Sequence, residues 1–434
     1  MIRGAAAQAF DVVIVGLGPT GATLANLCGQ LGLATLVIER STDPFPQPRA
    51  CHLDAEIARV FQGLGFEQQL RELLTVSAGM EYVDASGTRL FTFEGFERPQ
   101  LLGWSEDYVF IQPELDTMLR DGLARFPTVE VRLGVDAPPL PQLRGMGRFV
   151  VACDGAASAV RAQLGIELID LGFDQRWLVV DVMVNDTGTP SLPSIIQQVC
   201  DPHRLATFVP SHGRHRRWEF QLNDDEALPD PWQLLAPWGV TADNAELLRA
   251  AGYRFHALVA DRWRAGNVFV AGDAAHQMPP FMGQGMCCGV RDAANLAWKL
   301  HQVIQHRAAD TLLDSYEAER RPHVEAITRL SIEAGDLLGR LAADPTAQPA
   351  PAEVAPHPQW SRLPGLDLGR GFPVGHLVPQ PDRLDDRLPP GWVWVTDADD
   401  FEPPDGHPVV VEPAATYGHR AVLVRPDRYI AAVA

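Results

Sequence analysis

Residues 11–26 have the sequence DVVIVGLGPTGATLAN, in which an apolar run, a glycine-rich turn and an Ala/Leu-rich segment of helical periodicity follow one another. A second apolar run covers residues 34–38. This order predicts a βαβ unit with a parallel sheet. We therefore expect an α/β protein with a Rossmann-like domain.

The turn carries glycines at the spacing that a bound dinucleotide requires. Gly16 permits the tight turn, Gly18 lets a pyrophosphate approach the backbone, and Gly21 lets helix and strand pack closely. The helix N-terminus then faces the phosphates, and Glu39 ends the second strand where it would bond a ribose. A chance glycine turn is the alternative, which the combined spacing disfavours. The candidate residues are Gly16, Gly18, Pro19, Thr20, Gly21 and Glu39.

Residues 271–300, AGDAAHQMPPFMGQGMCCGVRDAANLAWKL, indicate which dinucleotide binds. Asp273 ends a predicted strand where its carboxylate could bond the hydroxyls of a ribityl chain, which FAD has and NAD lacks. Prolines and glycines then lead into a helix whose first amides could stabilise negative charge on a reduced isoalloxazine. A simple N-cap role for Asp273 does not explain this long approach. The candidates are Gly272, Asp273, Gly283, Gln284, Gly285 and Met286.

A third motif, CDGAASAVR at residues 153–161, places Asp154 in a turn before a helix. Its carboxylate could support the cofactor or hold Arg49 in place, although a DG turn is also a common structural device. The position of the motif between the other two favours a role at the cofactor.

The rest of the sequence predicts an inserted domain and a C-terminal addition. Residues 171–255 are short β-rich pieces, typical of an antiparallel sheet inserted into the nucleotide-binding domain. Helices are expected at residues 20–31, 54–63, 113–125, 154–164, 283–306 and 311–341. The predicted parts are an FAD-binding domain (1–74, 105–170 and 256–341), a substrate-binding β domain (75–104 and 171–255), a Pro- and Ala-rich linker (342–364) and a C-terminal module (365–434).

The composition restricts the partners. The formal charge of -19 disfavours nucleic acid. No apolar run has the length of a membrane span, and residues 1–10 do not resemble a signal peptide. The six cysteines show no CxxC pair and no dense disulfide pattern. We expect a cytoplasmic protein that binds a small molecule, without nucleic acid, membrane or metal.

The motifs together resemble those of the single-component FAD-dependent aromatic hydroxylases of the para-hydroxybenzoate hydroxylase fold, in the subgroup typified by 3-(3-hydroxyphenyl)propionate hydroxylase. The resemblance covers most of the first 325 residues in the family's order. Besides the three motifs, it rests on PRA at 48–50, QPELDTMLR at 112–120, RWLVVDV at 176–182, RRWEFQL at 216–222 and YEAERRPH at 316–323.

The resemblance implies roles for four more residues. Arg49 matches an arginine close to flavin and nicotinamide, and Gln112 matches a glutamine that touches the cofactor. Pro280 matches the proline beside the reacting face of the flavin, and Arg40 would reach the adenosine phosphates or ribose. Arg49 and Pro280 are thus the candidate catalytic residues, through positioning, and no acid or base is assigned.

The resemblance also implies a reaction. NADH or NADPH visits transiently and reduces tightly bound FAD, and dioxygen then forms a flavin C4a-hydroperoxide that hydroxylates a phenolic or other aromatic substrate. One alternative is epoxidation or Baeyer–Villiger oxidation of a polyketide-like substrate. Another is a catalytically silent FAD-binding protein. A homodimer is left open.

Side chains of the inserted domain admit two interpretations. Trp218 and Phe220 alternate on one strand, which is typical of a core, but with Phe281 they could line the substrate pocket. Residues 212–217, HGRHRR, are predicted to form a solvated hairpin turn, with attraction of an anionic substrate or NADPH as the alternative.

Three residues of the second motif are predicted to be structural. His276 is more typical of a hydrogen-bonded turn residue than of a base, and Cys287 and Cys288 lack ligand spacing and are expected to pack.

Two segments are shorter than the family pattern. Between residues 134 and 149 the chain is expected to pass almost directly from strand to strand, through either a trimmed sheet or a missing piece of chain. The C-terminal module resembles an abbreviated thioredoxin-like domain without a CxxC, so no redox role is predicted for it.

Overall fold

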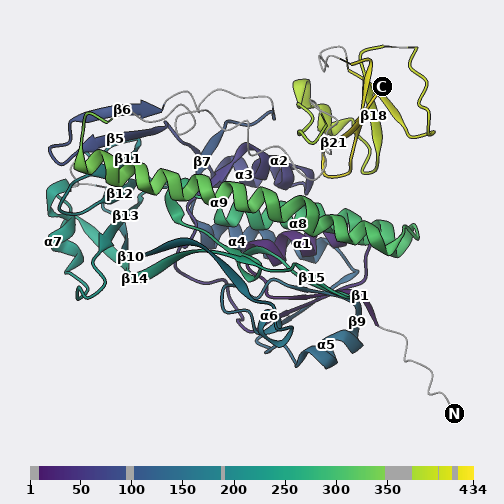
Figure 1. The fold of residues 1–434 in the computed structure, drawn as a ribbon, viewed down its shortest axis with the longest axis horizontal. Coiled ribbons are helices and arrows are strands. Elements are labelled where there is room, and N and C mark those ends of the chain that lie inside the picture. Colours follow the sequence, from purple (N-terminus) through teal and green to yellow (C-terminus); the bar gives the residue numbers. More distant parts are fainter. Residues whose placement is uncertain (1–8, 94–101, 187–190, 348–373, 399, 413–418) are drawn as a thin grey trace.

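A parallel sheet carries the glycine turn in the computed structural model, which describes residues 9–93, 102–186, 191–347, 374–398, 400–412 and 419–434 (Figure 1). Its strand order is β15-β16-β9-β1-β2-β8, with all neighbours parallel except the edge strand β15. The prediction of a βαβ unit is therefore confirmed. The strands are β1 (Phe10–Val15), β2 (Thr35–Glu39), β8 (Val129–Leu133), β9 (Gly147–Ala152), β15 (Arg264–Ala265) and β16 (Val268–Val270).

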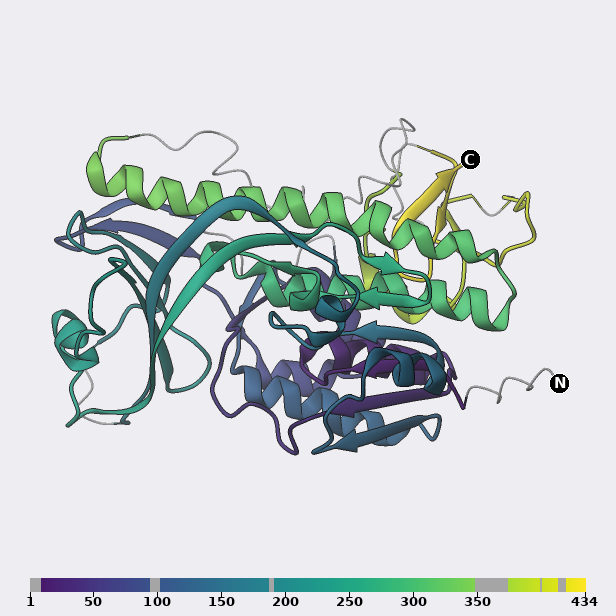
Figure 2. The ribbon, with the colours of Figure 1, turned by 60° about the horizontal axis from the view of Figure 1, so that its bottom comes forward.

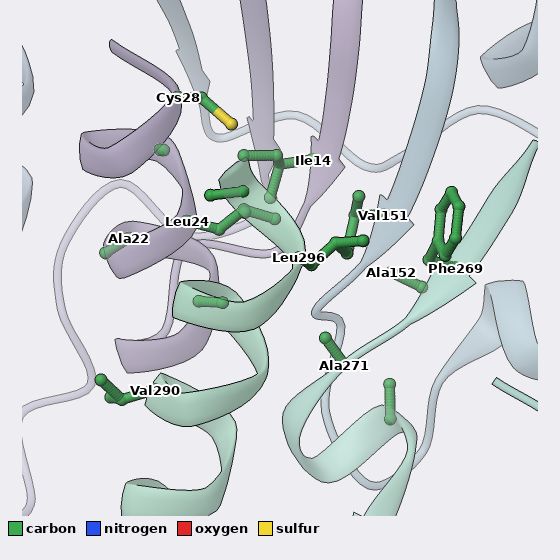
Figure 3. Packing of buried hydrophobic residues seen from close by; sticks show 14 of the residues in the cluster. Ile14, Ala22, Leu24, Cys28, Val151, Ala152, Phe269, Ala271, Val290 and Leu296 are labelled. Carbon is green, nitrogen blue, oxygen red and sulfur yellow. The ribbon is translucent and has the colours of Figure 1, made fainter. Parts of the chain in front are cut away.

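Helices α1 (Pro19–Gln30) and α8 (Gln284–Gln305) pack together over this sheet. Figure 3 shows Leu24 of α1 and Leu296 of α8 beside Ile14 of β1, all three fully buried. The helices approach closely because α8 has a glycine at the crossing: a Cβ built on Gly289 would lie 2.2 Å from Thr20 Oγ1. This close packing brings the two glycine-bearing motifs, far apart in sequence, to one end of the sheet.

A second, largely antiparallel sheet has the order β17-β14-β10-β13-β12-β11-β5-β6, and only β11 and β5 are parallel. Its two long strands, β10 and β14, curve away from the parallel sheet (Figure 2). The inserted sheet was expected from residues 171–255. The strands are β5 (Met80–Asp84), β6 (Arg89–Phe93), β10 (Leu168–Val184), β11 (Ile196–Cys200), β12 (Ala206–Val209), β13 (His215–Leu222), β14 (Ala245–Ala260) and β17 (His276–Gln277).

Helix α9 (Asp314–Ala343) runs along both parts of the molecule (Figures 1 and 2). It contacts α8 beside the parallel sheet, and β11, β14 and β5 of the second sheet. It therefore fixes the second sheet relative to the parallel one. The remaining elements before it are β3 (His52–Asp54), α2 (Ala55–Gly63), α3 (Glu67–Leu73), β4 (Thr75–Val76), β7 (Asp107–Val109), α4 (Gln112–Gly122), α5 (Leu140–Met146), α6 (Ala159–Gln163) and α7 (Pro231–Leu235).

Two local expectations need correction. The chain does not pass directly from β8 to β9, because α5 forms between them and buries Leu140 and Leu143 in the main core. The helix expected at residues 154–164 is shorter, since Asp154 and Ser158 accept hydrogen bonds from amides of α6 and so end the turn before it.

The C-terminal module contains a four-stranded sheet of order β19-β18-β20-β21. Buried polar contacts join it to the FAD-binding domain: Arg59 bonds Asp385, Arg425 bonds Glu319, and the Tyr429 hydroxyl donates to Glu56. Its thioredoxin-like character stays a prediction, and residues 348–364 of the expected linker lie outside the described residues. The strands are β18 (Val393–Thr396), β19 (Val409–Val411), β20 (Ala421–Val424) and β21 (Ile430–Val433).

Within the described residues, none of the helices is both long and apolar enough to span a bilayer.

The Glu319 carboxylate is expected to stabilise the docking of the C-terminal module. It accepts hydrogen bonds from Arg425, Lys299 and Asn295. Glu319→Gln removes the carboxylate that pairs with buried Lys299 and one of the two that pair with buried Arg425, and should lower the free energy of unfolding by about 3 kcal/mol, measured by denaturant unfolding. Glu130→Gln, at an exposed pair with Arg132, is the control and should cost less than about 1 kcal/mol.

The effect of Glu319→Gln should depend on pH. Burial alone raises the pKa of Glu319, but Arg425 and Lys299 outweigh it and lower that pKa from 4.5 to about 2. The ion pair of Glu319 with Arg425 therefore stabilises the fold fully above about pH 4.5 and loses its contribution as the pH falls toward about 2. The difference between wild type and variant should shrink over this interval, and a constant difference would contradict the assignment.

Candidate flavin and substrate site

The glycine turn between β1 and α1 has the geometry of a phosphate cradle. Gly16 has φ 99°, and a Cβ there would lie 2.3 Å from the Cys153 carbonyl oxygen. A Cβ on Gly21 would lie 2.1 Å from the Gly16 carbonyl oxygen, whereas one on Gly18 would meet nothing within 4 Å. Gly16 and Gly21 thus serve the turn and its packing, and Gly18 is the point where the backbone is open to a ligand.

Buried polar atoms without partners surround this turn. Asp154 Oδ2 accepts from the Val160 amide, but Oδ1 is buried and has no partner among the described residues. Arg120 Nε donates to the Leu17 carbonyl at 3.3 Å, and its buried Nη1 has no partner in the same part of the chain. Since an unpaired buried polar atom is costly, a bound polar group is expected here. The phosphates and ribityl hydroxyls of FAD fit this requirement.

The second motif meets the first at Gly272. A Cβ on Gly272 would lie 2.5 Å from Thr20 Oγ1, so the Thr20 side chain packs against the second motif. Asp273 follows in the single turn η3 (Gly272–Ala274) and is exposed. No described residue is hydrogen bonded to its carboxylate, which suits an acceptor for the ribityl chain.

Glu39 ties the glycine turn to the end of β2. Its Oε2 accepts from the Leu17 amide at 2.7 Å and its Oε1 from the Ser41 amide at 2.8 Å. Each carboxylate oxygen retains a second lone pair for a ribose hydroxyl. Arg40 is exposed beside it. The ribose and phosphate roles of these two residues stay predictions.

Two residues shape the N-terminus of α8: Gly283, whose backbone has a left-handed conformation, and Gln284, whose side-chain amide is buried. Gly283 has φ 63° and is the N-cap, and the single turn η4 (Pro280–Met282) precedes it. The Gln284 side chain is buried, donating to Asp54 and accepting from Arg291, so that only its backbone is left for the flavin. Gly285 and Met286 complete the half-buried first turn.

Pro280 lies half-buried in η4, and its carbonyl accepts from the Gly283 amide at 2.8 Å. Ser331 of α9 donates to the neighbouring Pro279 carbonyl, which anchors the turn. The carbonyl of Pro280 keeps a lone pair with which it could orient a substrate.

His52 is a charged neighbour of this turn that sequence reasoning missed. Its Nδ1 lies 3.3 Å from the Gly283 carbonyl oxygen, and its Nε2 is paired with Asp107. Burial lowers the pKa of His52, but the Asp107 carboxylate outweighs burial and raises that pKa well above its usual value. A cationic His52 and the α8 amides together favour negative charge on a flavin ring. The only sequence signal was its place three residues after Arg49.

The loop that carries Arg49 is held by its backbone. Gln112 Oε1 accepts from the Arg49 and Ala50 amides at 3.0 and 2.7 Å, and Arg217 donates to the Pro48 and Arg49 carbonyls. The Arg49 side chain is exposed, with its guanidinium 5.0 Å from the Phe45 ring. Gln112 thus positions the loop, and its contact with the cofactor stays a prediction. Asp154 bonds α6, as described above, rather than Arg49.

The prediction of a solvated turn at residues 212–217 is wrong for His215 and Arg217. Both side chains are buried on β13, where Asp181 of β10 accepts from His215 Nε2 at 2.9 Å and from Arg217 Nε at 2.8 Å. Arg249 of β14 donates to the same carboxylate. Burial raises the pKa of Asp181, but Arg217, His215 and Arg249 together hold it well below its usual value. The sequence of residues 212–217 indicates a solvated turn because the carboxylate that neutralises the buried charges lies on another strand, far away in the chain.

Trp218 and Phe220 occupy the opposite face of β13 and are core residues. Their rings lie 5.8 and 6.0 Å from that of Trp238, on the side covered by α7 and the following turn. The pocket interpretation of these two rings is therefore wrong, because strand alternation directs Arg217 toward the Arg49 loop and its neighbours away from it. Phe281 lies on the other side of the sheet, 5.5 Å from Trp177.

The structural interpretation of His276, Cys287 and Cys288 holds. His276 Nε2 is 2.8 Å from Asp292, and all three side chains are buried. Both cysteines are free thiols.

Comparisons with known proteins agree with this geometry. The model of a family described as FAD binding domain matches residues 9–331. The chain belongs to this family. A probable NADH-specific resorcinol 4-hydroxylase of Rhodococcus jostii (strain RHA1) is 39% identical, over 87% of this chain and 76% of its own length. A 3-(3-hydroxy-phenyl)propionate/3-hydroxycinnamic acid hydroxylase of Mycobacterium sp. (strain JLS) is 36% identical. The matched region covers 76% of this chain and 60% of that relative's length.

Solved structures share the architecture. Aklavinone-11 hydroxylase, solved with FAD and aklavinone, has a TM-score of 0.78 at 21% identity, covering 99% of this chain and 96% of its own. A p-nitrophenol 4-monooxygenase of Pseudomonas putida DLL-E4 has a TM-score of 0.67 at 24% identity, covering 79% of this chain and 91% of its own. The comparisons confirm the predicted family, fold class and cofactor, and the enzyme class of FAD-dependent aromatic hydroxylases.

Two glycine substitutions should separate cofactor binding from folding. Gly18→Ala places a methyl group in the open space meant for the pyrophosphate and should weaken FAD binding roughly tenfold or more, without changing the stability of the apoprotein. Gly21→Ala collides with the Gly16 carbonyl and should lower apoprotein stability by about 1–3 kcal/mol. Flavin fluorescence titration and thermal unfolding provide the two readouts. Equal stability losses in both variants would contradict these roles.

Asp273→Ala should weaken FAD binding by roughly 10- to 100-fold, because the ribityl hydroxyls lose a charged acceptor. Flavin content after dialysis and fluorescence titration measure it. Asp136→Ala, at another exposed aspartate, is the control. Unchanged FAD occupancy in Asp273→Ala would show that the ribityl chain binds elsewhere.

Proposed function

We propose that this chain is a monooxygenase that uses FAD, NADH and dioxygen to hydroxylate a phenolic ring. The observation that carries the proposal is that one face of the second sheet meets both segments expected to flank the flavin. At one contact Arg217 holds the Arg49 loop, and at the other Trp177 packs against Phe281. A small aromatic molecule between these contacts would lie against the isoalloxazine.

The chemistry of oxygen transfer belongs to bound FAD, which takes electrons from the nicotinamide and passes them to dioxygen. The protein contributes charge and position. The α8 amides and cationic His52 would stabilise negative charge, and the backbone bonds of Gln112 and Arg217 hold Arg49 where a nicotinamide could approach.

The name of the Rhodococcus relative supports NADH over NADPH and a phenol as the substrate. The resemblance of the site residues to those of aromatic hydroxylases supports the same reaction class. A cytoplasmic location is proposed on the sequence alone.

Anaerobic mixing of the FAD-loaded enzyme with NADH tests this function. Phenol, resorcinol and 3-(3-hydroxyphenyl)propionate are each added, and at least one should accelerate flavin bleaching. Under isotopically labelled dioxygen, the same compound should gain one labelled oxygen, detected by mass spectrometry. Flavin that stays oxidised with every phenol would overturn the proposal. An epoxide or ester product would show that the enzyme catalyses epoxidation or Baeyer–Villiger oxidation instead of hydroxylation.

Arg49→Gln should slow anaerobic flavin reduction by roughly 10- to 100-fold, because the nicotinamide loses a positioning contact. Arg132→Gln, at an exposed arginine of β8, is the control and should reduce at the wild-type rate. Equal rates in the two variants would exclude Arg49 from nicotinamide placement.

A further inference from the structure

A strip of polar side chains crosses the second sheet on the face toward the Arg49 loop. Glu219 of β13, Thr207 of β12 and Gln198 of β11 are direct cross-strand neighbours. All three are buried, and Thr207 Oγ1 donates to Gln198 Oε1 at 2.7 Å. Buried polar groups on three adjacent strands are unusual in a sheet face that serves only as core.

The strip lies between the two contacts that join the sheet to the flavin-binding elements. Glu219 is two residues from Arg217, which bonds the Arg49 loop, so the two side chains share a face. Across the ladder Glu219 pairs with Val179, which stands between Trp177 and Asp181 on β10. Trp177 contacts Phe281. Glu219 therefore occupies the part of the face against which a substrate would rest.

The Glu219 carboxylate has no hydrogen-bond donor in the part of the chain that the structure describes. Its nearest cation is Arg217, whose Nη1 is 3.9 Å from Oε1, too far for a hydrogen bond. No described residue donates a hydrogen bond to this carboxylate, although Glu219 is only 9% exposed. Burial raises the pKa of Glu219, against the attraction of Arg217. A buried acceptor without a donor is destabilising, so a ligand that brings a donor gains affinity.

The cations near Glu219 are already committed. Arg217 donates to Asp181 and to the Pro48 and Arg49 carbonyls, and Arg249 donates to Asp181 and the Tyr253 hydroxyl. A carboxylate placed beside Glu219 would be repelled by it, because neither Arg217 nor Arg249 is left to pair with the added charge. A neutral hydroxyl would not.

We propose that Glu219, together with Thr207 and Gln198, binds the phenolic hydroxyls of the substrate and selects neutral, hydroxyl-bearing rings of the resorcinol type over rings that carry a carboxylate. The inference rests on the proposed function and specifies its substrate class. The phenol O–H donates to the Glu219 carboxylate. The Thr207 hydroxyl oxygen accepts from a second hydroxyl, and the Gln198 amide nitrogen donates to one.

Binding to the FAD-loaded enzyme tests the proposal. Resorcinol and 3-(3-hydroxyphenyl)propionate are titrated against the flavin absorbance, and the wild type should bind resorcinol at least tenfold more tightly. Glu219→Gln should weaken resorcinol binding by 10- to 100-fold and raise KM more than it lowers kcat. Glu81→Gln, whose side chain bonds Gln197, is the matched control on the same sheet and should bind resorcinol as the wild type does.

The outcomes separate this inference from the proposed function. If phenols accelerate flavin reduction but Glu219→Gln binds resorcinol as the wild type does, the role of Glu219 is wrong and the hydroxylase function stands. Tighter wild-type binding of the carboxylated compound would also overturn it. If no phenol accelerates reduction, both proposals fail. Should Glu219→Gln not fold, Thr207→Val removes one polar group of the strip and should still weaken resorcinol binding several-fold, and unchanged binding there would overturn the proposal.

Discussion

The buried Arg217 guanidinium joins the two halves of the site. Asp181 neutralises it from within the second sheet, and its remaining donors reach the backbone of the loop that carries Arg49. An unpaired guanidinium could not be buried here, since its desolvation would be too costly, so the loop and the sheet depend on each other through one ion cluster. The relative placement of the flavin-binding turn and the substrate face follows from it.

On the FAD-binding side, buried polar atoms without hydrogen-bond partners favour binding of a polar ligand. The glycine turn leaves backbone open at Gly18, and Asp154 and Arg120 present buried polar atoms without partners in the described chain. These atoms cost free energy in the empty protein and recover it when phosphates and hydroxyls arrive. Glu219 on the substrate side resembles these atoms, because no described residue donates a hydrogen bond to its buried carboxylate.

The C-terminal module reaches the flavin side through a chain of hydrogen bonds. Tyr429 donates to Glu56, Glu56 accepts from Arg291, and Arg291 bonds Gln284 in the first turn of α8. A module without a redox motif thus has a structural route to the helix whose amides face the cofactor. The module can therefore affect the position of α8, but none of its described side chains enters the glycine turn.

Sequence alone determined the parts that depend on local backbone geometry. Glycine spacing between a strand and a helix, and an aspartate that ends another strand, specify a dinucleotide turn and an FAD-type partner, because the main chain and its immediate neighbours do the binding. Tertiary structure decided everything that depends on which strand faces meet. The burial of His215 and Arg217, the outward core position of Trp218 and Phe220, and the pairing of His52 with Asp107 arise from register between strands far apart in the chain. A shift of one residue would exchange the two faces, and no local pattern records that choice.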